Sequence, residues 1–171
     1  MTPKIQLHNG KMFDLLDPDM ATTDLPTIAH HLSYINRYTG ARHLPCSVLT
    51  HSILVCLLAP PAYKREALMH DSPEFALGDV SSPLKALLPE YRRIEHEHAQ
   101  RLQRKYDLRD WDSIPEVKSA DNKAYEIECE MDQGIPPRAV VGISLYDLFD
   151  LSPAQTQNLF LLLCAVLDIA D

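Results

Sequence analysis

Two histidines and two aspartates in this chain carry side chains that can share one metal ion. His70 and Asp71 are adjacent, His51 lies upstream of them and Asp121 lies downstream. Imidazole is a ligand for zinc, iron, cobalt and nickel, and carboxylates extend the range to manganese. A metal that takes five or six ligands would keep positions for water and for a substrate oxygen. The set therefore predicts a metal centre that activates water for attack on an electrophile such as phosphorus.

Acidic residues that follow the His-Asp pair could assist such a reaction. Glu74 is three residues beyond Asp71, about one helical turn, and could orient the attacking water. Asp79 follows a glycine and could approach the leaving group as a proton donor. Taken alone, an acidic loop is usually a solvated surface and a buried His51 is usually a core residue. Together, His51, the His70-Asp71 pair and Asp121 offset the cost of one another's burial if a cation lies between them.

Cationic and aromatic residues offer contacts for a phosphorylated substrate. Lys85 can meet a phosphate as a point charge, and Lys118 precedes Asp121 by about one helical turn. Arg37 can clamp a phosphate through two parallel hydrogen bonds, and the neighbouring Tyr38 can stack on a base. Each is more often a surface charge or a core aromatic, so these assignments depend on the metal centre.

Size and composition favour one globular domain over residues 1–171. The 46% hydrophobic and 23% charged content is that of an ordinary folded protein, and the net charge of −8 argues against a nucleic-acid polymer as partner. The longest apolar run, Leu159 to Leu167, is too short to span a bilayer, and Met1 to Gly10 lack the apolar core of a signal peptide. The four cysteines show no CxxC spacing and are expected to be reduced thiols. A cytoplasmic location without membrane attachment is expected.

Periodicity predicts an all-α fold with a small N-terminal β-hairpin. Asn9-Gly10, between alternating apolar and polar residues, favours a two-residue turn with positive φ at both positions. Proline, glycine and capping residues then divide the chain into helices. They are expected over about 24–39, 46–59, 61–70, 89–106 and 113–131 and from 152 onward, with short helical turns near 78–83 and a Pro/Gly-containing stretch over 134–142.

Several short motifs together resemble the HD-domain phosphohydrolases. They are Asn36-Arg37-Tyr38, Thr50-His51-Ser52, His70-Asp71-Ser72-Pro73-Glu74, Gly78-Asp79-Val80, Pro83-Leu84-Lys85 and Lys118-Ser119-Ala120-Asp121. The similarity is to the branch that holds the YfbR-type 5′-deoxynucleotidases and the small phage dATP triphosphohydrolases of the DatZ type. It covers about residues 3 to 131 and implies a compact HD-domain helical bundle.

The resemblance also implies roles for individual residues. Metal ligands would be His51, His70, Asp71 and Asp121; Glu74 and Asp79 would be catalytic; Arg37, Lys85 and Lys118 would bind phosphates; Tyr38 and Pro83 would lie near the nucleoside. The metal would be Co, Mn, Zn or Fe, and a second divalent ion such as Mg²⁺ could accompany the substrate phosphates. Tyr38 stands where the deoxynucleotidases typically have tryptophan, so base selectivity is the property that the resemblance predicts least. A homo-oligomer, dimer or hexamer, is implied, in the host cytoplasm if the protein is phage-encoded.

The predicted function is metal-dependent hydrolysis of a deoxynucleotide. Three cationic side chains near one metal, and the short His51-to-His70 interval, favour a dNTP triphosphohydrolase, perhaps of the dATP type, that releases deoxynucleoside and triphosphate. One alternative is a 5′-deoxynucleotidase that cleaves a dNMP to deoxynucleoside and phosphate. Another is a non-catalytic nucleotide sensor, against which Glu74 and Asp79 count. An HD phosphodiesterase for cyclic or guanosine-polyphosphate signals is disfavoured by the absence of further His-Asp pairs.

Overall fold

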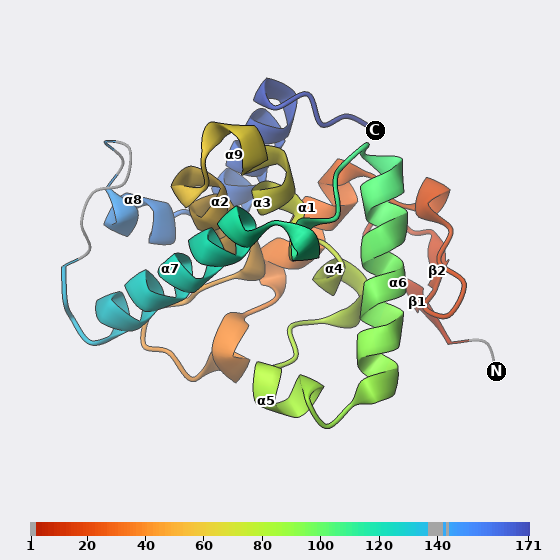
Figure 1. The fold of residues 1–171 in the computed structure, drawn as a ribbon, viewed down its shortest axis with the longest axis horizontal. Helices are drawn as coiled ribbons and strands as arrows, with labels where there is room; N and C mark the ends of the chain where they lie inside the picture. The colour runs from red at the N-terminus through yellow and green to blue at the C-terminus, as the bar shows by residue number, and fades with distance from the viewer. Residues whose placement is uncertain (1–2, 137–141, 143) are drawn as a thin grey trace.

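A two-stranded hairpin precedes a set of packed helices in the computed structural model, which describes residues 3–136, 142 and 144–171 (Figure 1). The mostly helical architecture and the N-terminal hairpin confirm this part of the prediction. The strands are β1 (Lys4–Gln6) and β2 (Met12–Asp14). The helices are α1 (Leu25–Tyr34), α2 (Val48–Leu58), α3 (Lys64–Met69), α4 (Glu74–Leu77), α5 (Ser82–Lys85), α6 (Pro89–Lys105), α7 (Pro115–Asp132), α8 (Leu145–Phe149) and α9 (Pro153–Val166), with short 3-10 turns η1 (Met20–Thr22), η2 (Arg37–Gly40), η3 (Pro61–Tyr63) and η4 (Trp111–Ser113).

The hairpin turn differs from the expected two-residue turn. Leu7 N–H donates to Lys11 O at 2.8 Å and Gly10 N–H donates to Leu7 O at 2.9 Å, so three residues form the loop. Only Gly10 has a positive φ, 82°, as in a type I turn followed by a left-handed residue. The Asn9 side chain accepts from Lys11 N–H, which stabilises this turn without a positive φ at Asn9.

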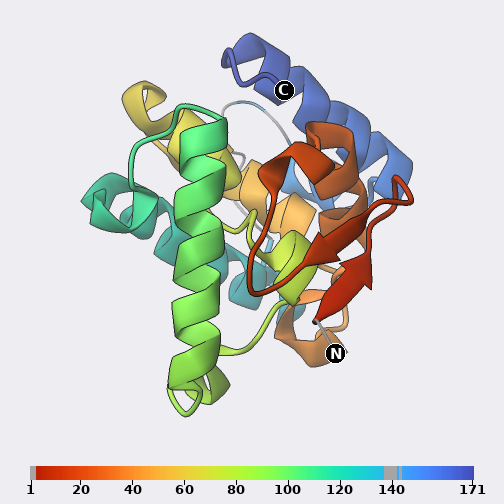
Figure 2. The ribbon, with the colours of Figure 1, turned by 90° about the vertical axis from the view of Figure 1, so that its right-hand side faces the viewer.

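The hairpin lies on the side of the molecule that carries α4 and α6 (Figure 2). Phe13 of β2 attaches it to these helices. It is 1% exposed, and its ring contacts Phe75 of α4 at 5.2 Å and His98 of α6 at 5.6 Å between centroids. His98 also donates from Nε2–H to the carbonyl of Leu15, at 2.9 Å. The segment that carries Glu74 is thereby held between the hairpin and α6.

Helix α1 ends earlier than expected. Asp24 caps it by accepting from Thr27 N–H at 2.8 Å, but the helix stops at Tyr34. Asn36 then pairs with Ser47 in an isolated β-bridge, and Tyr38 begins two successive residues with positive φ. This long-range pairing ends the helix and leaves Arg37 and Tyr38 on the separate turn η2.

Helix α2 is the centre of the core. Each residue from Val48 to Cys56 is buried, so the helix has no solvated face, and α1, α3, α7 and α9 pack against it. Buried apolar side chains from these helices form one cluster. The position of α2 fixes His51 at the middle of the molecule.

The remaining expected helices are present with shifted ends, and α8 lies within a stretch for which no helix was expected. Part of the expected Pro/Gly-containing stretch, residues 137–141, lies outside the described residues. All four cysteines are free, as expected. Over the described parts of the chain, none of the helices is both long enough and apolar enough to cross a membrane.

Candidate metal centre

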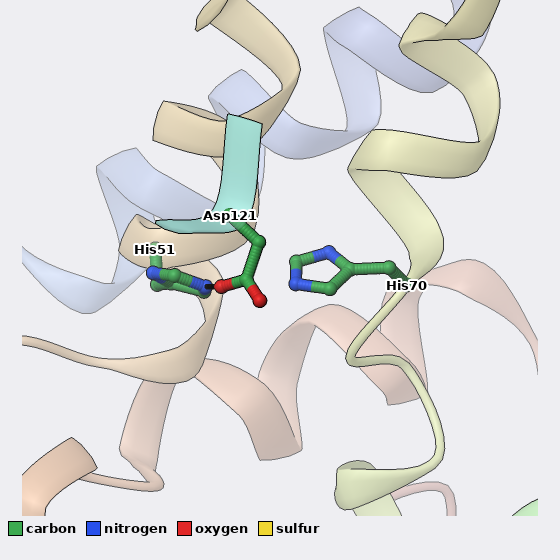
Figure 3. Close-up of side chains that lie close together, drawn as sticks. All are labelled: His51, His70 and Asp121. Atoms are coloured by element: carbon green, nitrogen blue, oxygen red, sulfur yellow. Dashed lines mark ion pairs between the residues drawn. The ribbon is translucent and has the colours of Figure 1, made fainter. Parts of the chain in front are cut away.

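Three of the four expected metal ligands converge from separate helices (Figure 3). His51 projects from the buried α2, His70 follows the end of α3, and Asp121 projects from α7. One ligand atom from each residue lies within 4.8 Å of the others. His51 Nε2 lies 3.2 Å from Asp121 Oδ1. This group could hold a metal ion.

Asp71, the fourth expected ligand, lies beside the same group. Its Oδ2 is 3.5 Å from His51 Nε2 and 3.3 Å from His70 Nε2. The same oxygen is 3.4 Å from Nη1 of Arg37. The adjacent His-Asp pair thus directs both side chains toward His51 from one turn of backbone.

Hydrogen bonds orient both imidazoles toward the centre of the group. His51 Nδ1 lies 2.7 Å from Glu128 Oε1, and His70 Nδ1 lies 2.8 Å from the carbonyl oxygen of Ala67. Because both partners only accept, each Nδ1 carries the proton and each Nε2 has its lone pair free when the ring is neutral. Both Nε2 atoms are buried and make no hydrogen bond to a described residue. Two inward lone pairs beside two carboxylates fit a divalent transition metal.

Glu128, which was not predicted from the sequence, supports the centre from behind His51. It is 4% exposed and accepts from the hydroxyl of Tyr38, while its Oε2 lies 3.5 Å from Nε of Arg37. Glu128 is two helical turns after Asp121 on α7, with the buried Ala124 between them. This spacing of seven residues is the signal that could have identified it.

Three of the expected ligands, His51, Asp71 and Asp121, have shifted pKa values. Burial and the charge of Arg37 lower the pKa of His51, whereas the nearby carboxylates of Asp121 and Glu128 raise it, with a net pKa of about 9. Burial acts to raise the pKa of Asp71, but His70, His51 and Arg37 hold it well below its usual range. Asp121 behaves alike: burial opposes ionisation, while His51, His70 and Lys118 lower its pKa. Both aspartates are therefore ionised, as metal ligands must be.

A cleft of about 530 Å³ opens beside this centre and is lined by residues of α6 and α7, among others. Its size is that of a small-molecule site. The lining residues bring together five carboxylates, three cations, two histidines and an apolar wall: Asp71, Glu74, Glu95, Asp112, Asp121; Lys85, Arg92, Lys118; His70, His96; Pro73, Ala99, Trp111, Val117. The excess of carboxylates favours binding of a cation before an anionic substrate.

Glu74 and Lys85 face each other in the cleft. Lys85 Nζ lies 3.5 Å from Glu74 Oε1 and 2.5 Å from Glu95 Oε1. The other oxygen of Glu74, Oε2, is buried without a hydrogen bond to a described residue. Burial, with the nearby charges of Asp71 and Asp79, raises the pKa of Glu74 well above its usual value, and Lys85 opposes the shift.

The other predicted substrate contacts divide into two groups. Lys118 lines the cleft and pairs with Asp121, with Nζ 2.7 Å from Oδ2. Arg37 and Tyr38 contact Glu128 from η2, and the Tyr38 ring also lies 4.2 Å from the guanidinium carbon of Arg42. Pro83 is exposed on α5, and Asp79 is half-buried after α4. The described residues that line the cleft include none of Arg37, Tyr38, Asp79 and Pro83.

Comparison with known proteins identifies relatives but no activity. No family model matches the chain. It is 34% identical over 165 residues to the uncharacterized protein YfdR of Escherichia coli (strain K12), which covers 92% of this chain and 91% of YfdR. It is also 35% identical over 92 residues to an uncharacterized protein of Rhodobacter capsulatus, covering 48% of this chain and 47% of that protein.

Proposed function

Because the chain belongs to the same protein family as YfdR, whose name assigns no activity, we propose its function from its own site: it is a metal-dependent phosphohydrolase of the HD type. One observation carries the proposal. Two buried imidazole nitrogens without hydrogen bonds to described residues face the carboxylates of Asp71 and Asp121 beside an open cleft. Leaving two such acceptors unsatisfied costs about 1–3 kcal/mol each, which a metal ion would offset.

The donor set suits the metals of such enzymes. Two neutral imidazoles and two carboxylates balance one divalent charge, and Co, Mn, Zn and Fe all accept this mixture of nitrogen and oxygen ligands. A bound metal of this kind supplies Lewis acidity and lowers the pKa of water, so that water becomes nucleophilic near neutral pH.

We assign Glu74 the task of orienting the attacking water. Lys85 contacts one of its carboxyl oxygens, which leaves Oε2 directed into the buried space without a described partner. Glu74 is also anchored, because its helix begins directly after the His-Asp turn and the adjacent Phe75 packs against Phe13. A general base fixed in this way contributes about 10²–10⁴-fold to a rate.

The substrate class that we propose is a deoxynucleotide. Water adds to the α-phosphorus, the bond from that phosphorus to O5′ breaks, and O5′ leaves with a proton as the deoxynucleoside hydroxyl. From a dNTP the other product is triphosphate, and from a dNMP it is phosphate. The triphosphate is favoured by Lys85, Arg92 and Lys118 along one cleft, since developing negative charge is stabilised by fixed cations.

A 5′-deoxynucleotidase is the second candidate. Arg37 is one of the three cations expected at the phosphates, but it is already paired with Asp71 and Glu128. Fewer cations are then left for a triphosphate, which favours a monophosphate substrate. Both reactions break the same bond, so the metal centre and Glu74 have the same task in each.

A product assay with one variant tests the proposal. The protein is incubated with each dNMP and dNTP and Co²⁺ or Mn²⁺, and release of phosphate or triphosphate is measured. We expect triphosphate from a dNTP, and Glu74→Gln should abolish turnover while nucleotide and metal binding persist. Glu126→Gln, on the exposed side of α7, is the matched control. Nucleotide binding without turnover for any metal would contradict hydrolysis and favour the sensor.

A further inference from the structure

Arg92 on α6 is the cleft cation whose charge is not neutralised by a described residue. The other two cations that line the cleft are paired: Lys85 with Glu74 and Glu95, and Lys118 with Asp121. Arg92 forms no ion pair with any residue in the described part of the chain, although its side chain lines the cleft.

The neighbouring Arg93 shows that the pairing of an arginine on α6 depends on the helix face from which it projects. Arg93 Nη2 lies 2.6 Å from Glu90 Oε1, and its Nη1 lies 3.6 Å from Glu97 Oε2, so it belongs to the solvated face of α6. Arg92 shares its face with Glu95, His96 and Ala99, at the helical spacings of three, four and seven residues, and all of them line the cleft. Two adjacent arginines on one helix thus have different surroundings.

We propose that Arg92 binds the phosphates beyond the α-phosphorus of a nucleoside triphosphate and so selects triphosphate over monophosphate. This inference rests on the proposed phosphohydrolase function. Both substrates place the α-phosphate at the metal centre, and only the triphosphate continues beyond it. In a cleft with five carboxylates a polyphosphate needs a cation that is not already paired. A guanidinium suits this task, because it binds phosphate oxygens through two parallel hydrogen bonds.

The test compares Arg92→Gln with Arg93→Gln on two substrates. With the metal-loaded protein, kcat/KM is measured for dATP and for dAMP. Loss of a charge-assisted hydrogen bond predicts that Arg92→Gln lowers kcat/KM for dATP by about tenfold or more and leaves dAMP unchanged. Arg93→Gln should change neither, and Arg92→Lys should restore part of the loss. An equal effect of Arg92→Gln on both substrates, or no effect on dATP, overturns the inference.

A binding arm separates this inference from the proposed function. Inorganic tripolyphosphate and orthophosphate are titrated into the metal-loaded wild type and the two variants by calorimetry, without any turnover. Tripolyphosphate that binds about tenfold more weakly to Arg92→Gln than to Arg93→Gln supports the role of Arg92 even if no nucleotide is hydrolysed. Equal tripolyphosphate affinity in the two variants overturns it. Turnover of dNMPs alone, with tripolyphosphate bound no better than orthophosphate, overturns it while the phosphohydrolase proposal stands.

Discussion

Replacement of Glu128 by glutamine tests how the protein prepares His51 for a metal. Glu128 uses both carboxylate oxygens: Oε1 receives Nδ1–H of His51, and Oε2 receives the hydroxyl of Tyr38 and lies near Nε of Arg37. Glutamine has nearly the same shape but only one oxygen. Its NH₂ group must therefore face either the imidazole N–H or the two donors on the η2 turn, and one contact becomes repulsive.

The expected loss is in metal affinity. Removing the partner that orients a ligating histidine typically weakens metal binding by about 10–100-fold, which is about 1.4–2.7 kcal/mol. The upper part of this range is expected here, because Glu128 is 4% exposed and water cannot replace the lost contact. Glu128→Ala should in addition lower the stability of the metal-free protein by about 1–3 kcal/mol, since it leaves the buried His51 Nδ1–H unsatisfied and removes the partner of the half-buried Tyr38 hydroxyl.

Calorimetric titration of the metal-free protein with Co²⁺ measures the affinity, and thermal unfolding without metal measures the stability separately. Glu126→Gln removes a charge from the exposed side of α7 and is the control. A Glu128→Gln variant that folds and binds Co²⁺ as tightly as the wild type would refute the view that Glu128 sets the geometry of His51. So would an equal loss of affinity in Glu126→Gln, because that effect would be one of net charge.

Further predictions concern the metal ligands, an ion pair and the core. His70→Ala should weaken Co²⁺ binding by about 100-fold or more, whereas His43→Ala, outside the cluster, should bind as the wild type does in the same titration. Burial raises the pKa of Glu66, but Arg109, with Nη2 2.9 Å from Oε2, lowers it below its usual value. A carboxyl group whose pKa is lowered by folding stabilises the fold at pH values above its ordinary pKa, and this stabilisation is lost as the pH falls through the lowered pKa. Glu66→Gln should therefore lose less stability than the wild type between about pH 7 and about pH 3, as measured by urea unfolding. Leu54→Ala, at a fully buried position of α2, should lower the free energy of unfolding by about 2–5 kcal/mol, and a loss below about 1 kcal/mol would contradict the central place of α2.

The convergence of the metal ligands could be predicted because each residue type is unusual in its setting. His51 lies in an otherwise apolar helix and Asp121 on a face with Val117 and Ala124, where an unpaired polar group is costly. The adjacency of His70 and Asp71 then needs only a turn after α3 to bring both side chains to the same point. Local patterns sufficed for this part of the site.

Features that depend on long-range contacts were not predictable in this way. The end of α1 is set by the pairing of Asn36 with Ser47, eleven residues further along the chain. The sequence near Tyr34 contains no residue that would predict this helix end. Arg92 and Arg93 are equivalent in the sequence, because both lie in a run of charged residues on a solvated helix. Both are exposed, and only the folded arrangement shows that Arg92 lines the cleft whereas Arg93 pairs with Glu90 and Glu97.

The charges around the proposed metal centre separate two tasks that share few residues. Behind the centre, Arg37 lies between Asp71 and Glu128, so its charge serves the ligands and is largely neutralised before a substrate arrives. In front of it, Lys85 is shared between Glu74 and Glu95. Under the proposed function, Lys85 can hold Glu74 and meet an α-phosphate only by loosening one of these pairs. Charge beyond the α-phosphate must then be met by Arg92 or by a second divalent ion carried on the phosphates. Under the proposed function, substrate length is therefore decided on α6, away from the residues that activate water, and it could change without altering the metal centre.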